Sequence, residues 1–424
     1  MDTAIDQPTD VTPPPFAQPA PRSTRLPYRR IAAQAAAIWL ATRVIYALMT
    51  YFTALVTSAQ VSPGTSASRA SFLGWQRFDV GWYVSIAASG YDDPRKAAFF
   101  PLYPALVAGV STLLGDAQHV VSGMLISNAA ALVAFFGVGL LAASEDRPEA
   151  ATGAMRALAA YPLAFFTVAA YADSLFLACA VFALFFARRE HWRAAGACGF
   201  LAALTRPVGM VLLIPLLWEY GRRRHWWRWW WSWWTMRGWR QPSRIARLTP
   251  GGLAEAALVI GAIPAALALY AGFLWWRFGD PLLFVHAEQL GWHRIPMPLW
   301  QALGLDAGSL FAAPPLSLSA ARIWLDALPV IAILVLTLWN LRRMPPAFAF
   351  FMLGLLYVAL SAPKADNGIP LAAAGRYLLP SVPIFLLLGR WTRRSPALDT
   401  IVVSGGFALQ ALFTAFFLTG GYLI

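Results

Sequence analysis

The segment QHVVSGMLISNAAALVAFFGVGLLAA, residues 118–143, contains no Asp, Glu, Lys or Arg. A helix of about 20 mainly apolar residues crosses the roughly 30 Å hydrocarbon layer of a membrane, so this segment is long enough to span one. The whole chain is similarly apolar, with 59% hydrophobic and 12% charged residues and a mean hydropathy of +0.56. This composition excludes an ordinary soluble domain and predicts an integral membrane protein.

Comparable apolar segments recur from residue 31 to the end of the chain. None shows the alternation over ten residues that is typical of strands in a membrane barrel. Since backbone groups in lipid must be hydrogen-bonded within the protein, helices remain as the spanning elements. We therefore predict an all-α polytopic membrane protein with about 11 membrane helices.

The first 30 residues differ from the rest because they are polar and rich in proline. We expect residues 1–30 to form a disordered cytoplasmic tail and residues 31–424 to form a single transmembrane domain. Cys179 and Cys198 lie in apolar segments without metal or redox spacing, so we interpret them as packing residues.

The basic residues predict the topology, because Lys and Arg close to membrane ends favour the cytoplasmic side. Arginines just before residue 31 place the N-terminus in the cytoplasm. Later basic clusters must be separated by even numbers of crossings, which requires the segment 99–115 to lie on the outer face within a first external loop, 59–117. The basic clusters are at 188–193, 222–247, 342–343 and 390–394.

The same parity predicts the remaining spans. The region 195–220 should break into two short helices at Thr205-Arg206-Pro207, because proline disrupts a helix interior. A second external loop should cover 277–320. The other expected spans are 31–58, 118–143, 151–170, 173–187, 253–276, 322–341, 346–362, 371–389 and 398–420.

An Arg/Trp run, Arg222 to Arg240, lies within the predicted cytoplasmic linker 221–252. Basic residues interleaved with aromatics can stack on nucleic-acid bases. Between two membrane helices, however, indole rings favour the headgroup level and arginines attract anionic lipids. We interpret 222–247 as an interfacial anchor on anionic lipids and predict no nucleic-acid partner.

Charged residues within or beside the predicted spans are candidates for function, since charges at that depth are rare and usually paired or functional. Asp79, Asp173, Arg206 and Arg376 belong to this group, and the topology places them toward the external side. In contrast, ordinary surface or packing positions are expected for Glu145, His119, His191 and His225.

Several segments resemble the PIG-V-type mannosyltransferases, bacterial relatives of the enzyme that adds the second mannose in glycosylphosphatidylinositol synthesis, within the GT-C superfamily. The chain has Phe78 where the family commonly has Trp, and Asp173 where it has Glu. The matching segments are RFDVGWYVSIAASGYDD (77–93), AAFFPLYP (97–104), YADSLF (171–176), LTRPVG (204–209), GDPLLFVHAEQLGWHR (279–294) and AGRYLLPSVPIFLLLGRW (374–391).

The resemblance implies a GT-C architecture and transfer of a sugar, mannose above all, from a polyprenyl-phosphate donor to a glycan or glycolipid acceptor outside the cytoplasm. Inverting transfer needs one carboxylate to take the acceptor proton, a role that we assign to Asp79. The leaving phosphate needs cations, for which Arg206, Arg376 and the adjacent Tyr377 are candidates. Candidates for acceptor or sugar binding are Asp173, His286, Glu288, Gln289 and Trp292.

No HxH, HExxH or DxD spacing fixes a metal site, so we predict no metal and no cofactor. Two other functions remain open. One is transfer of a different lipid-linked sugar, since nothing in the residues distinguishes mannose from its epimers. The other is transport of a lipid-linked sugar, which the lack of corresponding sequence halves disfavours. The composition suggests a bacterial plasma membrane.

Overall fold

The computed structural model describes residues 26–58, 72–115, 118–224, 250–312, 314, 317–364 and 371–420. This described part is helical, with a single isolated bridge between Arg294 and Lys364 as its only β pairing. These observations confirm the predicted all-α membrane fold. Within the described residues, five helices are long and apolar enough to cross a membrane: α1 (Tyr28–Ser58), α5 (His119–Glu145), α11 (Pro250–Phe278), α14 (Leu318–Asn340) and α18 (Pro396–Thr419).

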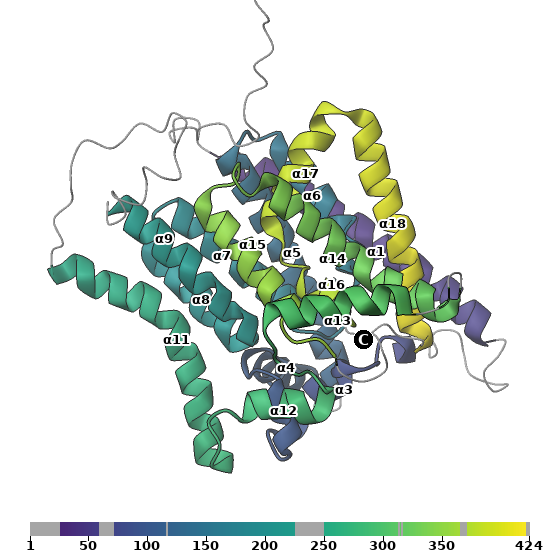
Figure 1. Ribbon diagram of the computed structural model, residues 1–424, viewed down its shortest axis with the longest axis horizontal. Coiled ribbons are helices and arrows are strands. Elements are labelled where there is room, and N and C mark those ends of the chain that lie inside the picture. Colours follow the sequence, from purple (N-terminus) through teal and green to yellow (C-terminus); the bar gives the residue numbers. More distant parts are fainter. Residues whose placement is uncertain are drawn as a thin grey trace, which may run out of the picture.

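The long helices form a bundle together with shorter apolar ones (Figure 1). Close helix contacts depend on glycine: a Cβ at Gly137 of α5 would lie 2.6 Å from the side chain of Val181. Small residues at such contacts let helix backbones approach in a membrane. The shorter helices of the bundle are α6 (Ala150–Ala159), α7 (Asp173–Arg188), α8 (Trp192–Thr205), α9 (Leu213–Arg223), α15 (Pro346–Leu360), α16 (Ala374–Tyr377) and α17 (Val382–Arg394).

A layer of short helices gathers toward one end of the bundle (Figure 1). The segment predicted to lie on the outer face contributes a helix of 13 residues, which at 1.5 Å per residue is too short to cross about 30 Å of hydrocarbon. The residues that the N-terminal part of the chain contributes to the candidate functional site lie in this layer. Its elements are α3 (Asp79–Ser89), η1 (Pro94–Ala98), α4 (Leu102–Leu114), α12 (Leu283–Trp292) and α13 (Leu299–Ala312).

The predicted break at Thr205-Arg206-Pro207 is confirmed. Helix α8 ends at Thr205, Arg206 has an extended backbone (φ −157°, ψ 147°), and Pro207 begins the 3-10 helix η3 (Pro207–Leu212). A proline lacks the N–H of a helix interior and clashes with the preceding turn. Arg206 therefore projects from an irregular point inside the bundle.

Two predicted spans are wrong as continuous helices. The segment 151–170 contains α6, which ends at Ala159, and then the 3-10 helix η2 (Ala164–Thr167). The segment 371–389 contains the four-residue α16 and then α17, which continues to Arg394. Pro162 and Pro380 lie at these interruptions. Each proline ends a helix within a segment whose mean hydropathy alone predicted a continuous span.

Glu145 is not the solvated loop charge expected from the sequence. Arg188 donates to both of its carboxylate oxygens at 2.7 Å, and also to Glu219 at 2.9 Å. All three side chains are buried. The ends of α5, α7 and α9 thus share one ion cluster. Sequence patterns missed this cluster because Glu145 and Arg188 are 43 positions apart.

We expect Arg188→Met to lower the free energy of unfolding by about 3–5 kcal/mol, since it leaves two buried carboxylates without their shared cation. Thermal unfolding in detergent would measure the change. Arg189→Met is the matched control, because Arg189 is only half-buried and stacks on Phe185. Equal melting temperatures for the two variants would contradict a stabilising role of the cluster.

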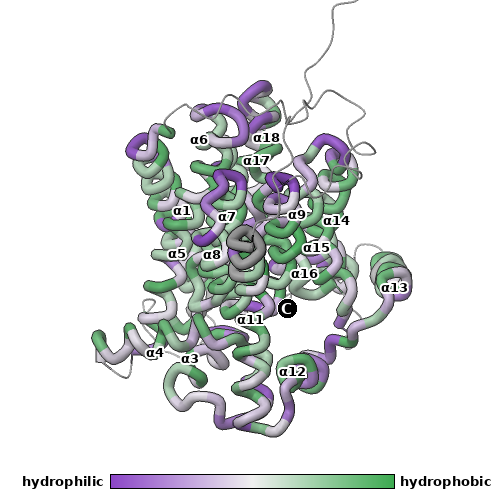
Figure 2. Tube along the Cα trace, turned by 90° about the vertical axis from the view of Figure 1, so that its left-hand side faces the viewer, coloured by the Kyte–Doolittle hydropathy of each residue, from purple (hydrophilic) through white to green (hydrophobic). Residues whose placement is uncertain are grey.

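Polar positions gather at the ends of the bundle and apolar positions along its length, as Figure 2 shows. At the end opposite α12, Arg222, Arg223 and Arg224 are ion-paired with acidic residues of the same region. The rest of the Arg/Trp run and of the predicted anchor 222–247 lies outside the described residues, as do residues 1–25 of the predicted tail. The anchor on anionic lipids therefore stays a prediction.

Candidate functional site

Asp79 is the first residue of α3 and is 8% exposed. The preceding residue, Phe78, has φ 55°, a value that is unusual for a bulky side chain. Such strained positions persist only where packing enforces them, and the Phe78 ring packs on Phe417 at 5.6 Å. The turn at Phe78 therefore fixes the direction in which the Asp79 carboxylate points.

The other three charged candidates also come from helix ends or breaks. Asp173 is the first residue of α7, Arg206 lies at the break after α8, and Arg376 lies in the short helix α16. A helix N-terminus favours a carboxylate because the peptide dipoles carry partial positive charge there. Both aspartates are placed in this way.

The four charges form one buried network. Arg376 donates through Nη1 to Oδ2 of Asp79 at 2.6 Å and through Nε to Oδ2 of Asp173 at 3.1 Å. Arg206 donates through Nη1 to the other oxygen of Asp173. Two carboxylates and two guanidiniums thus balance in charge, with Arg376 bridging segments that are 297 and 203 positions apart.

Aromatic rings cover the guanidiniums. The Cζ atom of Arg376 lies 4.4 Å from the ring centroid of Tyr171 and 5.0 Å from that of Phe166. The Tyr377 ring lies within 5.1 Å of Arg206 and 5.0 Å of Arg294. Stacking of this kind holds a guanidinium plane while leaving its edge to donate hydrogen bonds.

The network opens onto a cavity of about 300 Å³ between the bundle and α12. Its walls combine charged groups with apolar side chains such as Phe284, Val285 and Val358. This mixture is typical of a site for an amphipathic ligand. Six of the residues predicted from sequence line it: Asp79, Arg206, Glu288, Trp292, Arg376 and Tyr377.

Two predicted acceptor residues are not in this cavity. His286 is exposed and its Nδ1 lies 2.7 Å from Oδ2 of Asp280, while Gln289 is exposed on the same helix. Helix α12 turns only one face to the cavity, and Glu288 and Trp292, four positions apart, share that face. The structure therefore does not bring His286 and Gln289 into this cavity, and their part in acceptor binding stays a prediction.

Asp173 does not line the cavity but lies behind it, 2% exposed and bound to both arginines. Its carboxylate holds Arg206 and Arg376 in place, and its part in acceptor binding stays a prediction. An aspartate suits the role because its short side chain, held at a helix end, reaches both cations.

Sequence reasoning missed Arg294, a third cation on the cavity wall. Its Nη1 donates to the carbonyl of Ala362 at 3.0 Å and its Nη2 to that of Ala372 at 2.6 Å. The only signal was its place at the end of the motif 279–294, in a loop where a solvated charge is the usual outcome. Tyr83 and Thr205 were also missed and line the same cavity.

Aromatic residues of the layer of short helices form one side of the cavity. The Trp292 ring lies 5.3 Å from Phe99 and 5.6 Å from Trp82, and Phe99 also packs edge-on against Tyr83. Flat rings of this kind pack against the apolar faces of sugars and exclude water. The segments 77–93 and 97–104 thus contact each other at this side of the cavity.

Burial raises the pKa of the Glu288 carboxyl above its ordinary range, against the opposing effect of Arg294. Glu288 therefore holds its proton to a higher pH than an exposed glutamate. Protonated, it is neutral and can donate a hydrogen bond within the cavity; ionised, it adds a negative charge. We expect binding of an anionic ligand to weaken as pH rises through this pKa.

Glu288→Gln should remove that pH dependence, since a glutamine stays neutral and keeps a donor. The check is the Kd of a polyprenyl-phosphate sugar, whose phosphodiester keeps one negative charge across the acidic to neutral range. Wild-type Kd should rise with pH, whereas that of the variant should stay level. The same rise in both proteins would assign the titration to another group.

The described residues contain no group of three or more His, Cys, Asp and Glu side chains that could hold a metal ion. Asp79 and Asp173 instead face guanidiniums. The prediction that no metal or cofactor takes part stays a prediction.

Solved structures that are similar to this chain include the following three. They are ArnT from Cupriavidus metallidurans bound to undecaprenyl phosphate (16% identity, TM-score 0.49), the apo oligosaccharyltransferase of Archaeoglobus fulgidus (14%, 0.40), and AglB from the same organism with an inhibitory peptide and a dolichol-phosphate (13%, 0.37). The alignments cover 87%, 90% and 90% of this chain but 63%, 55% and 55% of those proteins. The chain thus spans less than two thirds of their length. No family model and no curated protein matches the chain.

Proposed function

We propose that the protein is a membrane glycosyltransferase of the GT-C superfamily. In this proposal it transfers a mannosyl residue from a polyprenyl-phosphate donor to an acceptor hydroxyl on the extracytoplasmic face. The observation that carries the proposal is that one cavity combines a carboxylate, Asp79, with three arginines and an apolar wall. Sugar transfer from a lipid phosphate needs these three elements together.

Asp79 is the proposed general base of an inverting displacement. Arg376 binds its Oδ2, so in the part of the chain described here Oδ1 is the oxygen available to an acceptor hydroxyl. As that hydroxyl attacks the anomeric carbon, the glycosidic bond to phosphate breaks and the proton passes to Asp79. The ion pair with Arg376 holds the carboxylate in position before the acceptor arrives.

The arginines are the proposed phosphate site. A sugar-linked lipid phosphate carries about one negative charge and gains another when the bond breaks, so nearby cations stabilise the transition state more than the bound donor. Arg206 donates one bond to Asp173 and lines the cavity, so its other nitrogens suit a phosphate. Tyr377, held between Arg206 and Arg294, completes this wall.

The apolar and aromatic residues suggest where the rest of each substrate lies. Phe284, Val285 and Val358 offer a path for the first isoprene units of the donor. Glu288 and Trp292 face the same space from α12 and are the proposed contacts for sugar hydroxyls and a sugar face. Asp173 is proposed as a positioning residue for the arginines.

The proposed location is a bacterial plasma membrane, with the N-terminus in the cytoplasm and the site outside. Basic residues at the opposite end of the bundle from α12 support this orientation. No nucleotide sugar, metal or other cofactor is needed, because a lipid phosphate is the leaving group and guanidiniums supply the positive charge.

Purified protein in liposomes should transfer mannose from a synthetic polyprenyl-phosphate mannose to a glycolipid acceptor. Matched donors with glucose, galactose or a pentose on the same lipid phosphate test the choice of sugar. Mannose should give the highest kcat/KM. Turnover of another sugar in its place would overturn the mannose assignment alone, whereas the absence of turnover with every lipid-phosphate donor would overturn the proposed reaction.

A further inference from the structure

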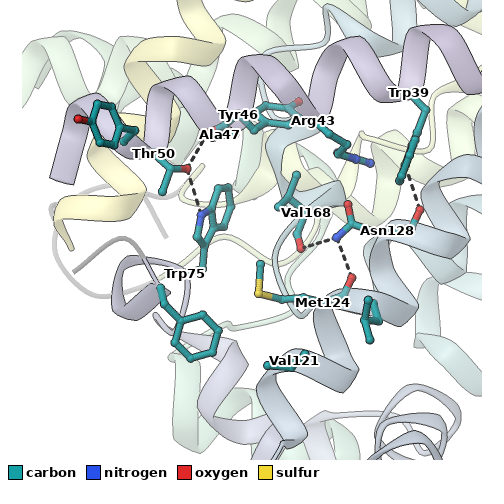
Figure 3. A pocket seen from close by; sticks show the side chains of 13 residues that line it. Trp39, Arg43, Tyr46, Ala47, Thr50, Trp75, Val121, Met124, Asn128 and Val168 are labelled. Atoms are coloured by element: carbon teal, nitrogen blue, oxygen red, sulfur yellow. Dashed lines mark hydrogen bonds between the residues drawn. The ribbon is translucent and has the colours of Figure 1, made fainter. Parts of the chain in front are cut away.

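A second hollow lies on the side of the bundle between α1 and α5 (Figure 3). It has a volume of about 670 Å³ and is lined mainly by apolar and aromatic side chains, among them Trp39, Tyr46, Trp75, Met124 and Leu125. None of its lining residues lines the cavity of Asp79. It is therefore a separate site, and the proposed sugar transfer does not use it.

Among the described residues that line this groove, Arg43 is the one that carries a charge. Its Cζ lies 5.3 Å from the Trp39 ring and 5.7 Å from the Tyr46 ring, both on α1 (Figure 3). Nη1 and Nη2 donate to the hydroxyl and carbonyl of Thr167 at 3.1 and 3.4 Å. Its buried Nε has no hydrogen-bond partner.

No carboxylate in the described part of the chain lies within ion-pair distance of Arg43. Three buried arginines differ in this respect. Arg188, Arg206 and Arg376 each bind carboxylates. A cation at membrane depth is costly without an opposite charge. The described residues therefore leave the charge of Arg43 without a carboxylate to balance it.

We propose that the groove binds one anionic phospholipid of the bilayer, with its phosphate on the Arg43 guanidinium and an acyl chain along α1 and α5. Phosphate oxygens match the planar donors of a guanidinium. Along α1 the lining runs from Trp39 to Tyr51, which is about 18 Å at 1.5 Å per residue. From Arg43 to Tyr51, which lies eight positions further along α1, the lining offers about 12 Å to an acyl chain.

The position of the groove identifies the source of the lipid. Tyr51 and Leu125 line it and are also exposed, so the groove opens sideways, where a membrane helix faces lipid. Its lining on α5 starts two residues after the His119 end of that helix. The lipid thus enters from the leaflet on the side of α3 and α4.

The groove also adjoins the segment that leads to Asp79. The indole of Trp75 donates to the Thr50 hydroxyl of α1 at 3.1 Å, and Trp75 precedes Asp79 by four positions. An acyl chain in the groove would pack on this indole. The bound lipid therefore supports the turn that positions α3, without contact with the reacting atoms.

Native mass spectrometry of protein released from nanodiscs of mixed phosphatidylglycerol and phosphatidylcholine tests the proposal. Wild-type protein should retain one phosphatidylglycerol. Arg43→Gln should reduce retention about tenfold through loss of a charge-assisted bond. Leu125→Trp, which fills the groove and keeps the charge, should reduce it similarly. Arg156→Gln is the matched control, because Arg156 pairs with Asp399 outside the groove, and should behave as wild type.

Wild-type retention of phosphatidylglycerol by either groove variant would overturn the proposal. So would retention of phosphatidylcholine in proportion to its share of the nanodisc, since no anionic selectivity would then exist. If a polyprenyl phosphate added to the nanodiscs displaces the bound phospholipid, the groove belongs to a substrate rather than to the bilayer. Leu125→Trp keeps the test decisive if Arg43→Gln does not fold.

Discussion

Asp79→Asn is expected to reduce sugar transfer by about 10²–10⁴-fold, the usual contribution of a positioned general base. Asparagine has nearly the same shape as aspartate but cannot accept the proton of the acceptor hydroxyl. Initial rates of transfer from a polyprenyl-phosphate sugar would measure the loss. It should appear in kcat, because donor binding depends on the arginines and the apolar wall.

Folding effects can be separated from catalysis in this variant. Arg376 keeps its bond to Asp173 when Asp79 is replaced, so the melting temperature and the donor Kd should change little. Asp280→Asn is the control, since Asp280 is a carboxylate of the external region that pairs with His286 outside the cavity. Full turnover in Asp79→Asn would disprove the base assignment.

Arg376→Ala is expected to be the most destabilising change in the site, by about 3–5 kcal/mol, and to abolish transfer. It removes the side chain that binds both aspartates, and uncompensated buried charge is costly. It also empties the space beneath the Tyr171 and Phe166 rings. Thermal unfolding and transfer rate, measured on the same preparation, would show both effects.

Arg376→Lys tests whether geometry or charge matters. An ammonium keeps the positive charge but cannot make the planar contacts of a guanidinium with two carboxylates, so we expect partial recovery of stability and little recovery of activity. Arg95→Ala is the control, because Arg95 pairs with Asp93 and is largely exposed. A wild-type melting temperature for Arg376→Ala would show that the bridge is not structural.

The two expected phenotypes distinguish the roles within one network. Asp79→Asn should leave a folded protein that binds the donor without turning it over. Arg376→Ala should instead lose stability, because the site does not assemble without this side chain. Opposite behaviour, with an unstable Asp79→Asn and a stable, inactive Arg376→Ala, would mean that Arg376 acts on the donor phosphate and Asp79 supports the fold.

Some of this molecule could be predicted from the sequence because the causes are local. The charge-free run 118–143 determines α5, and Pro207 determines the break that carries Arg206. Asp79 and Glu288 were identified as candidates from residue type and position, and both line the cavity. Hydropathy and proline geometry belong to a segment of chain whatever it later packs against.

The partners of each charge were decided only in the tertiary structure. Arg376 meets Asp79 across 297 positions and Arg188 meets Glu145 across 43, and no local pattern specifies such pairs. Arg294 lines the cavity although it was not a candidate, and His286 was a candidate but does not line it. Which face of a short helix turns toward a cavity depends on what the helix packs against. The free-energy cost of an unpaired charge depends on how deeply it is buried, and burial is a property of the assembled bundle.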